Sequence, residues 1–263
     1  MLIENRLLKL LFKIFISIII LFILLPMITI IIMSINPNRS LSFPFKGVTF
    51  EWFLNYFNSE IWITATAYSF KIAIMTAILT TILGTLAAYS LTKGNFKGKD
   101  STFVFLITPL IVPPMVLSIS LYFFFSQLKL IGTLLPIVIG HTIISLPIVF
   151  VSITSSLQGI NQNIEKASRS LGASRLRTFF QIILPLILPG MISGSMFSFL
   201  LSFDELLIPM FLGGVEITTL PTHIWGQLTY TIDPTVSAVS SMIIISISSL
   251  VILINYILKK VGN

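Results

Sequence analysis

Residues 14–33 read IFISIIILFILLPMITIIIM, a run of 20 residues without a charged side chain. A helix that crosses the roughly 30 Å hydrocarbon core of a bilayer needs about 20 mostly apolar residues. The run has that length, and its apolar residues are continuous, without the alternation of a transmembrane β-strand. The sequence therefore predicts that α-helices hold this chain in a membrane.

Five further apolar runs follow along the chain, and each is long enough to cross a bilayer. The second run extends upstream past Lys71 to about residue 63. We therefore predict an all-α integral membrane protein with six transmembrane helices. The five further runs are residues 72–92, 101–128, 133–155, 186–212 and 234–258.

The composition supports a membrane protein and excludes soluble classes. Of the 263 residues, 55% are apolar and 10% are charged, whereas about a quarter of an ordinary soluble domain is charged. A soluble enzyme or regulator is therefore excluded. The absence of cysteine excludes disulfides, thiol catalysis and cysteine-based zinc sites.

The basic residues of the loops define an orientation. If the N-terminus is inside, the inner segments carry 12 Lys and Arg residues and the outer segments carry 3. Cytoplasmic loops have such an excess, so we expect both termini in the cytoplasm. The first run is longer than a usual signal-peptide core. Residues 34–37 form no small-residue cleavage site, so we expect an uncleaved first span.

The longest inner loop, from about residue 156 to residue 185, contains a short amphipathic helix. Ile164, Ala167 and Leu171 fall at positions i, i+3 and i+7 and share one helix face. Gly172 follows directly and is a predicted C-cap. Two interpretations stay open at this point: a surface helix of a cytoplasmic loop, or a coupling helix that fits a groove on a soluble partner.

Asp204 and Glu205 are the main candidates for a substrate pathway, because charged groups within a span are expensive and usually functional. Eighteen residues of helix after Leu186 place Asp204 about 27 Å along the fifth span, toward its outer end. If the helix continues, Glu205 faces protein or a partner subunit, and Asp204 points about 100° away, toward a cavity wall. The alternative is two carboxylates at the outer membrane surface. Small residues that permit close helix packing precede this pair, at Gly190, Gly194, Ser198 and Ser202.

Prolines and aromatic residues supply further pathway candidates. Pro113 and its neighbours interrupt the third span, either as a packing kink or as a break that lines the pathway. Trp225 and Tyr230 in the outer loop are pathway candidates or interfacial anchors. We expect His141, in the fourth span, to be a packing histidine with satisfied hydrogen bonds rather than a proton relay.

Catalysis by this chain is not expected. The sequence has no G-x-x-x-x-G-K-[ST] phosphate-binding loop and no H-E-x-x-H, and it contains 2 histidines. We therefore expect no catalytic residues, no metal site and no cofactor in this chain, and any ATP must be hydrolysed elsewhere.

The inner loop resembles the EAA loop of binding-protein-dependent ABC importer permeases. That motif reads E-A-A, three residues, G, and about a dozen residues later I-x-L-P, which Gly172 and residues 182–185 match. Counting back from Gly172, Lys166 stands at the motif's glutamate and Ser168 at its second alanine. Glu165 lies one position earlier, about 100° away around the helix.

Other segments are similar to the second permease subunit of spermidine/putrescine importers, over roughly residues 65–258. This resemblance implies the type I ABC importer permease fold, with the first membrane helix and an outer loop in residues 1–62 and the permease core in residues 63–258. The similar segments are Thr108–Pro114, Gly140–Thr142, Leu146–Pro147, Ser202–Glu205, Phe211–Gly214, Thr219–Pro221, Ile224–Trp225 and Asp233–Ala238.

The resemblance also implies partners and a location. We expect a heterodimer with a homologous permease, two ATPase subunits on the cytoplasmic loop and an external solute-binding protein, all at the bacterial plasma (inner) membrane. The residues expected to couple to the ATPase are Glu165, Lys166, Ala167, Ser168, Leu171, Gly172 and Arg175. The residues expected along the substrate pathway are Asp204, Glu205, Trp225, Tyr230 and Pro113.

These expectations lead to one predicted function and three alternatives. The chain is expected to be a permease subunit of an ATP-driven importer, with polyamines as the favoured solute and alternating access as the mechanism. An acidic outer loop agrees with a cationic solute. The alternatives are a permease for another small organic solute, an autonomous secondary transporter or channel, and a membrane scaffold.

Overall fold

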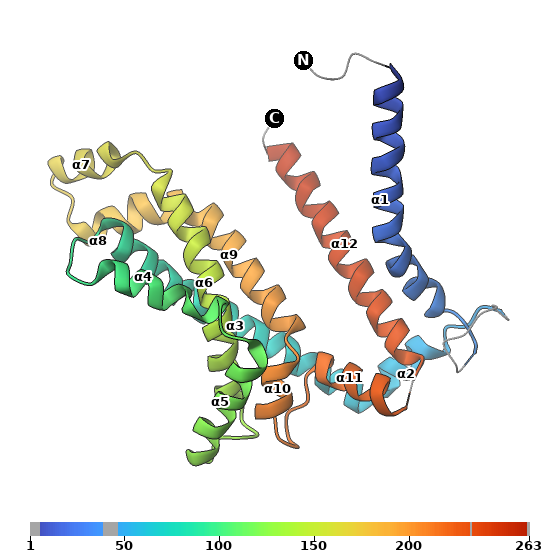
Figure 1. Ribbon diagram of the computed structural model, residues 1–263. Helices are drawn as coiled ribbons and strands as arrows, with labels where there is room; N and C mark the ends of the chain where they lie inside the picture. The colour runs from blue at the N-terminus through green and yellow to red at the C-terminus, as the bar shows by residue number, and fades with distance from the viewer. Residues whose placement is uncertain (1–5, 39–46, 232, 262–263) are drawn as a thin grey trace. The chain divides into compact units, whose positions relative to one another are not determined.

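The computed structural model of the chain describes residues 6–38, 47–231 and 233–261, which form helices and connecting loops and contain no β-strand (Figure 1). The predicted all-α class is therefore confirmed. Two short elements are a 3-10 turn, η1 (Thr108–Leu110), and a π-helical turn, η2 (Phe179–Ile183). The α-helices are α1 (Arg6–Met33), α2 (Glu51–Asn58), α3 (Glu60–Lys93), α4 (Lys99–Ile107), α5 (Pro114–Gln127), α6 (Leu134–Gln158), α7 (Gln162–Ser170), α8 (Arg175–Thr178), α9 (Leu184–Asp204), α10 (Leu207–Leu212), α11 (Leu220–Tyr230) and α12 (Thr235–Val261).

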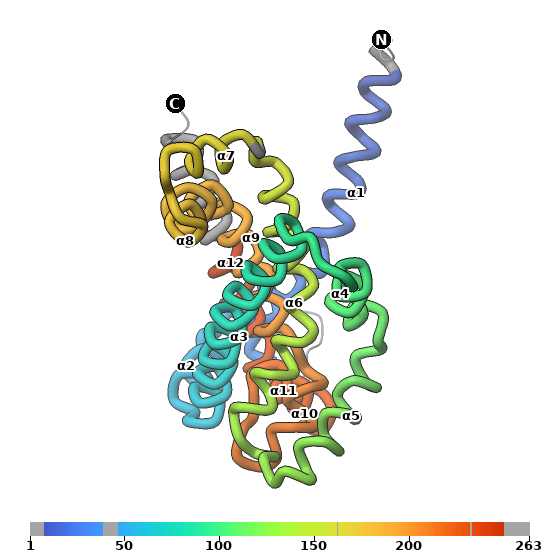
Figure 2. The backbone as a smooth tube through the Cα atoms, turned by 90° about the vertical axis from the view of Figure 1, so that its left-hand side faces the viewer, coloured from blue at the N-terminus to red at the C-terminus, as the bar shows by residue number. Residues whose placement is uncertain are grey.

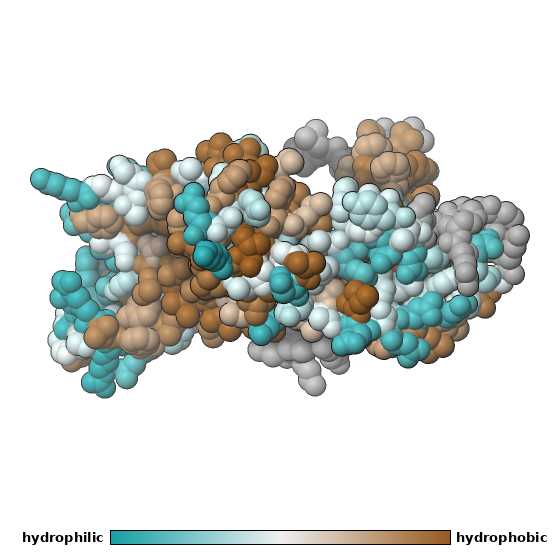
Figure 3. All heavy atoms as spheres, turned by 90° about the horizontal axis from the view of Figure 1, so that it is seen from below, coloured by the Kyte–Doolittle hydropathy of each residue, from teal (hydrophilic) through white to brown (hydrophobic). Residues whose placement is uncertain are grey.

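Several helices have the length and composition of membrane spans. Within the described residues, 4 helices qualify outright: α1 from Leu8, α3, α6, and the continuous helix Arg175–Asp204. If α4–η1 and α5 together form one bent span, the described residues contain up to 5 candidate spans. Thr235–Ser249 of α12 is a shorter apolar helix. Large apolar side chains are exposed along these helices, and hydrophobic residues occupy broad areas of the face seen in Figure 3. Such surfaces suit lipid rather than water.

Two of the predicted spans have different boundaries from those expected. The run 101–128 is not one straight helix, because its two parts are bent by 101° at a break before Pro114. The expected fifth span, residues 186–212, is wrong at both ends. Helix begins at Arg175, and it ends at Asp204 because Glu205 has extended backbone angles, with φ −70° and ψ 124°.

The chain divides into two compact units, each described here by itself: residues 1–63 with 224–263, and residues 64–223. In the first unit, α12 contacts both α1 and α2. The indole N–H of Trp52 in α2 donates to the carbonyl of Asn36 at 2.7 Å, which ties α2 to the chain just after α1.

The second unit is built around the contact between α6 and α9, which lie side by side (Figure 2). Small residues allow the close approach: a Cβ built on Gly190 would lie 2.0 Å from Ser156 Oγ, and one on Gly194 would lie 3.3 Å from Val149 Cα. Two apolar clusters fill this unit. The first contains Ala88, Leu91, Val149, Phe150, Ile153, Leu157, Ile183 and Ile187, and the second contains Ile72, Phe125, Ile137, Val138, Ile208, Leu212 and Ile217.

Candidate functional site

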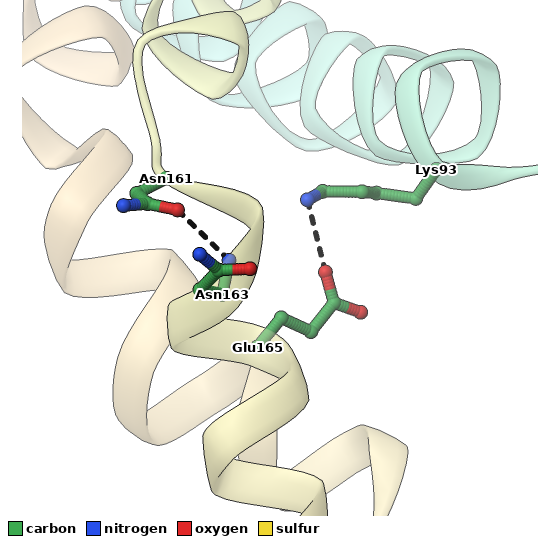
Figure 4. A network of polar contacts seen from close by, with 4 residues as sticks. All are labelled: Lys93, Asn161, Asn163 and Glu165. Atoms are coloured by element: carbon green, nitrogen blue, oxygen red, sulfur yellow. Dashed lines mark hydrogen bonds and ion pairs between the residues drawn. The ribbon is translucent and has the colours of Figure 1, made fainter.

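The loop of residues 156–185 folds into α7 and α8, which lead into α9 through η2. The side chain of Asn161 caps α7 by accepting a hydrogen bond from the N–H of Asn163 at 2.9 Å (Figure 4). At the other end, Gly172 has φ +87°. The N–H groups of Gly172 and of the next residue donate to carbonyls one turn back at 3.0 and 3.2 Å. This pair of bonds is a Schellman motif, so the predicted C-cap at Gly172 is confirmed.

An ion pair joins α7 to the end of α3. Lys93 Nζ lies 2.9 Å from Glu165 Oε2, and the two side chains are only 18% and 23% exposed. Figure 4 shows the two side chains pointing toward each other from their separate helices. Glu165 is therefore held within this chain, toward α3. The sequence predicts Lys93 only as a loop cation, because no local pattern pairs it with a residue so far along the chain.

The other candidate coupling residues divide into exposed and buried groups. Lys166, Ala167, Gly172 and Arg175 are exposed, and Leu171 is 89% exposed. On α8, Leu176 is 72% exposed.

Ser168 is buried, and its hydroxyl lies 3.0 Å from that of Thr178, which joins α7 to α8. The loop thus presents apolar and basic side chains outward while its inner contacts fix its shape.

A cavity of about 390 Å³ lies beside the ion pair, among the ends of α3, α4 and α6. Lys93 is part of its wall, so this cation borders both the cavity and α7. The Lys99 ammonium donates to the carbonyl of Gly94 at 3.3 Å. The residues around the cavity are Leu91, Thr92, Lys93, Lys99, Asp100, Phe103, Phe150, Thr154, Leu157, Gln158 and Ile160.

Buried polar side chains connect α3, α9 and α6 in the interior of the second unit. The hydroxyl of Thr80 lies 2.8 Å from that of Ser198, and the hydroxyl of Ser202 lies 2.6 Å from His141 Nδ1. His141 is buried in helix packing, as expected, but the expectation of a satisfied side chain is met only at Nδ1, because Nε2 has no hydrogen-bond partner among the described residues. Thr80 was not among the residues predicted from the sequence, although the polar pair Thr76 and Thr80, four residues apart in an apolar run, was a signal.

Five buried polar atoms of α3 and α6 have no hydrogen-bond partner among the described residues: Thr76 Oγ1, Thr92 Oγ1, Ser145 Oγ, Thr154 Oγ1 and His141 Nε2. The small-residue positions predicted on the fifth span are all buried, which agrees with their expected role in close packing.

The predicted pathway carboxylates lie at a corner between α9 and α10. Asp204, the last residue of α9, is exposed. Glu205 is half-buried, and its Oε1 accepts hydrogen bonds from the N–H groups of Leu207 and Ile208 at 2.9 and 3.2 Å. The side chain of Glu205 therefore caps α10. Because the helix ends here, the 100° offset expected between the two side chains does not apply.

The remaining pathway candidates lie on other elements. Pro113 precedes α5 at the 101° break and is exposed. Trp225 and Tyr230 lie on α11, in the first unit, and are 49% and 84% exposed. Within the described ranges, no group of three or more His, Cys, Asp or Glu residues is placed to hold a metal ion.

A helical membrane protein with a capped, outward-facing loop and no phosphate-binding motif has the features of a transport permease. The comparison with protein families supports this class. Residues 80–262 match the family described as binding-protein-dependent transport system inner membrane component. The chain belongs to that family.

Similar proteins support the same assignment to transport permeases. The chain is 31% identical to the spermidine/putrescine transport system permease protein PotC of Haemophilus influenzae, over 90% of this chain and 91% of that protein. It is 33% identical to the putrescine transport system permease protein PotI of Escherichia coli, over 85% and 82%. Its fold matches a chain of a bacterial ABC transporter involved in the import of alginate, with a TM-score of 0.72, 18% identity, and 98% and 99% coverage.

The family and the helices together establish the general role. The chain is an ABC importer permease, a multi-pass membrane component of the bacterial inner membrane. Both the resemblance drawn from the EAA-like loop and the predicted location are confirmed.

Proposed function

We propose that this chain is one of two permease subunits of an ATP-driven, binding-protein-dependent importer of polyamines. It has six membrane spans with both termini in the cytoplasm, and α4–η1–α5 forms one broken span. The excess of basic residues in alternate loops supports this orientation. Residues 63–258 form the permease core, and residues 1–62 supply the first span and an outer loop.

Two separate ATPase subunits bind the cytoplasmic faces of the permease pair, one of them at α7 and α8 of this chain. The observation that carries this proposal is the exposure of Leu171, at 89%, between the exposed basic residues Lys166 and Arg175. An exposed apolar side chain on a shaped helical loop suits a groove on a protein partner. The sequence has no phosphate-binding loop of its own, which agrees with a separate ATPase.

The solute is a polyamine, delivered by an external solute-binding protein. The names of the PotC and PotI relatives support this solute class. Asp204 can attract a cation, because its side chain is exposed at the end of α9. Glu205 contributes through the oxygen that does not cap α10. Pro113, Trp225 and Tyr230 line other parts of the pathway.

Co-purification tests the ATPase partner. The transporter is extracted from native membranes in mild detergent with wild-type chain, Leu171→Glu or Asn95→Glu, and ATPase activity is measured. We expect ATPase activity with the wild type and with Asn95→Glu, which adds the same charge at an exposed residue of the α3–α4 loop. Loss of activity only in Leu171→Glu supports docking at α7. A wild-type chain that purifies without an ATPase contradicts it.

Uptake assays test the solute and the energy source. Proteoliposomes that contain the purified transporter are supplied with its binding protein, ATP and labelled spermidine or putrescine. We expect uptake that requires ATP and falls in Asp204→Asn. Uptake without ATPase subunits would identify an autonomous secondary transporter. ATP-dependent uptake of another organic solute, with none of either polyamine, would reject the polyamine assignment.

A further inference from the structure

The surface of the short helix α2 has three sides that differ in burial and polarity. At 100° per residue, Trp52 and Tyr56 fall on one side and are buried, at 5% and 8% exposure. A second side carries polar, exposed residues. The third side carries large apolar side chains that are also exposed. The polar residues are Glu51, Asn55 and Asn58, and the exposed apolar residues are Phe50 at 65%, Leu54 at 61% and Phe57 at 62%.

The position of α2 in the chain places it where membrane spans end. Only Ser59 separates its last residue from the first residue of α3. Trp52 donates to the carbonyl of Asn36, three residues after α1 ends, and the N–H of Thr49 donates to the carbonyl of Ile35 at 2.8 Å. Since α1 qualifies as a membrane span and ends at Met33, these two bonds hold α2 near the end of that span and thus near the boundary of the bilayer.

Buried aromatic residues hold α2 against the protein. The ring centroids of Tyr56 and Trp62, the latter in the first turn of α3, are 6.2 Å apart, and both rings are buried. This packing leaves the opposite, apolar side of α2 free to meet another surface. An amphipathic helix at the boundary of a bilayer lies in the plane of the membrane with its apolar side in the acyl boundary.

We propose that α2 is an interfacial helix that inserts Phe50, Leu54 and Phe57 into the adjacent lipid leaflet. Its polar side, with Asn55, faces water, and Trp52 and Tyr56 hold it to the protein. The partner of the exposed apolar side is thus a lipid surface. The helix sets the depth at which the first unit of this chain, residues 1–63 and 224–263, sits in the bilayer.

Spin labels report directly whether a side chain faces lipid or water. They can be attached at single introduced cysteines, because the chain has no native cysteine to remove. Single variants Leu54→Cys and Asn55→Cys are labelled on the full-length chain, purified with its bound subunits and placed in phospholipid nanodiscs. Collision rates with oxygen, which concentrates in lipid, and with a water-soluble nickel chelate are then compared. We expect the oxygen-to-nickel ratio to be severalfold higher for the label at position 54 than at position 55.

Two outcomes would overturn the proposal. Strong nickel collision at position 54 would mean that α2 stands away from the bilayer. Low collision with both reagents at position 54 would mean that a protein subunit, rather than lipid, covers the apolar side. A second label pair, Phe57→Cys and Asn58→Cys, repeats the comparison one turn later and guards against local misfolding of a single variant.

Discussion

The hydroxyl of Ser202 lies 2.6 Å from Nδ1 of His141, and both residues are buried between α9 and α6. A second bond, between Ser198 and Thr80, joins the same face of α9 to α3. In a membrane interior, bonds between helices are worth about 0.6 kcal/mol on average and at most roughly 1.7 kcal/mol. These two contacts therefore fix which helix faces meet more than they add to total stability.

Removing the Ser202 hydroxyl should destabilise the permease measurably. In Ser202→Ala the imidazole loses the only hydrogen-bond partner that the described residues give it. We expect a loss of about 1 kcal/mol, which corresponds to a fall of roughly 2–4 °C in Tm. The measurement is size-exclusion chromatography of the detergent-purified protein after heating. Ser195→Ala is the control, because Ser195 is only half-buried and its hydroxyl bonds to the carbonyl of Ile192 in its own helix. An equal Tm for both variants would contradict the prediction.

Adding a methyl group to Gly190 should force α6 and α9 apart. The new Cβ would lie 2.0 Å from Ser156 Oγ and 3.1 Å from the carbonyl oxygen of Ser152. The hydroxyl can rotate away, but the backbone cannot, so we expect Gly190→Ala to cost about 1–3 kcal/mol. Gly194→Ala should cost less, because its shortest contact is 3.3 Å. Thermal stability in detergent ranks the two variants, and the reverse order would refute this packing argument.

The ion pair between Lys93 and Glu165 should appear as a coupling energy. We expect a double-mutant cycle with Lys93→Ala and Glu165→Ala to give roughly 0.5–1 kcal/mol, since the pair is only partly shielded from solvent. Tm values of the four proteins in detergent at low salt supply the cycle, and the coupling should shrink at high salt. Lys97, an exposed lysine of the neighbouring loop, replaces Lys93 in a control cycle that should be additive. Additivity in the first cycle would mean that the pair contributes nothing.

The left-handed backbone at Gly172 should tolerate asparagine better than valine. A Cβ at this position meets nothing within 4 Å, so the backbone angle alone is at issue. A β-branched residue there should cost about 1–2 kcal/mol and loosen the end of α7, whereas asparagine tolerates this conformation. Limited proteolysis with trypsin reports the change, because Arg175 and Arg177 nearby are exposed. We expect faster cleavage in Gly172→Val and near wild-type cleavage in Gly172→Asn; equal rates would show that this cap does not order the loop.

Much of the fold follows from the sequence, because uncharged runs and a single capping glycine are local signals. The apolar run 14–33 ends at the last residue of α1, and the apolar run 72–92 ends one residue before the last residue of α3. Gly172 ends α7 because glycine readily adopts a positive φ, so a single residue type is enough to predict the end of this helix. The motif around Gly172 also identified the family.

The unpredicted features depend on contacts between distant residues or on competition between local ones. Lys93 and Glu165 are adjacent only after α3 and α7 pack, and no spacing in the sequence predicts this contact. The end of α9 at Asp204 was missed because the run stays apolar through Leu212. The carboxylate of Glu205 stabilises a new helix start by accepting two backbone N–H groups, and this outweighs the continuity of the apolar pattern.

The use of Glu165 inside this chain limits how the permease can be re-engineered. The loop of residues 156–185, which we propose binds an ATPase subunit, could be exchanged between transporters so that one importer uses the ATPase of another. Here the loop's single acidic residue, Glu165, pairs with Lys93 at the end of α3. A foreign loop without a carboxylate at that position would leave Lys93 facing the cavity without its counter-ion. A working chimera must therefore exchange the end of α3 together with the loop.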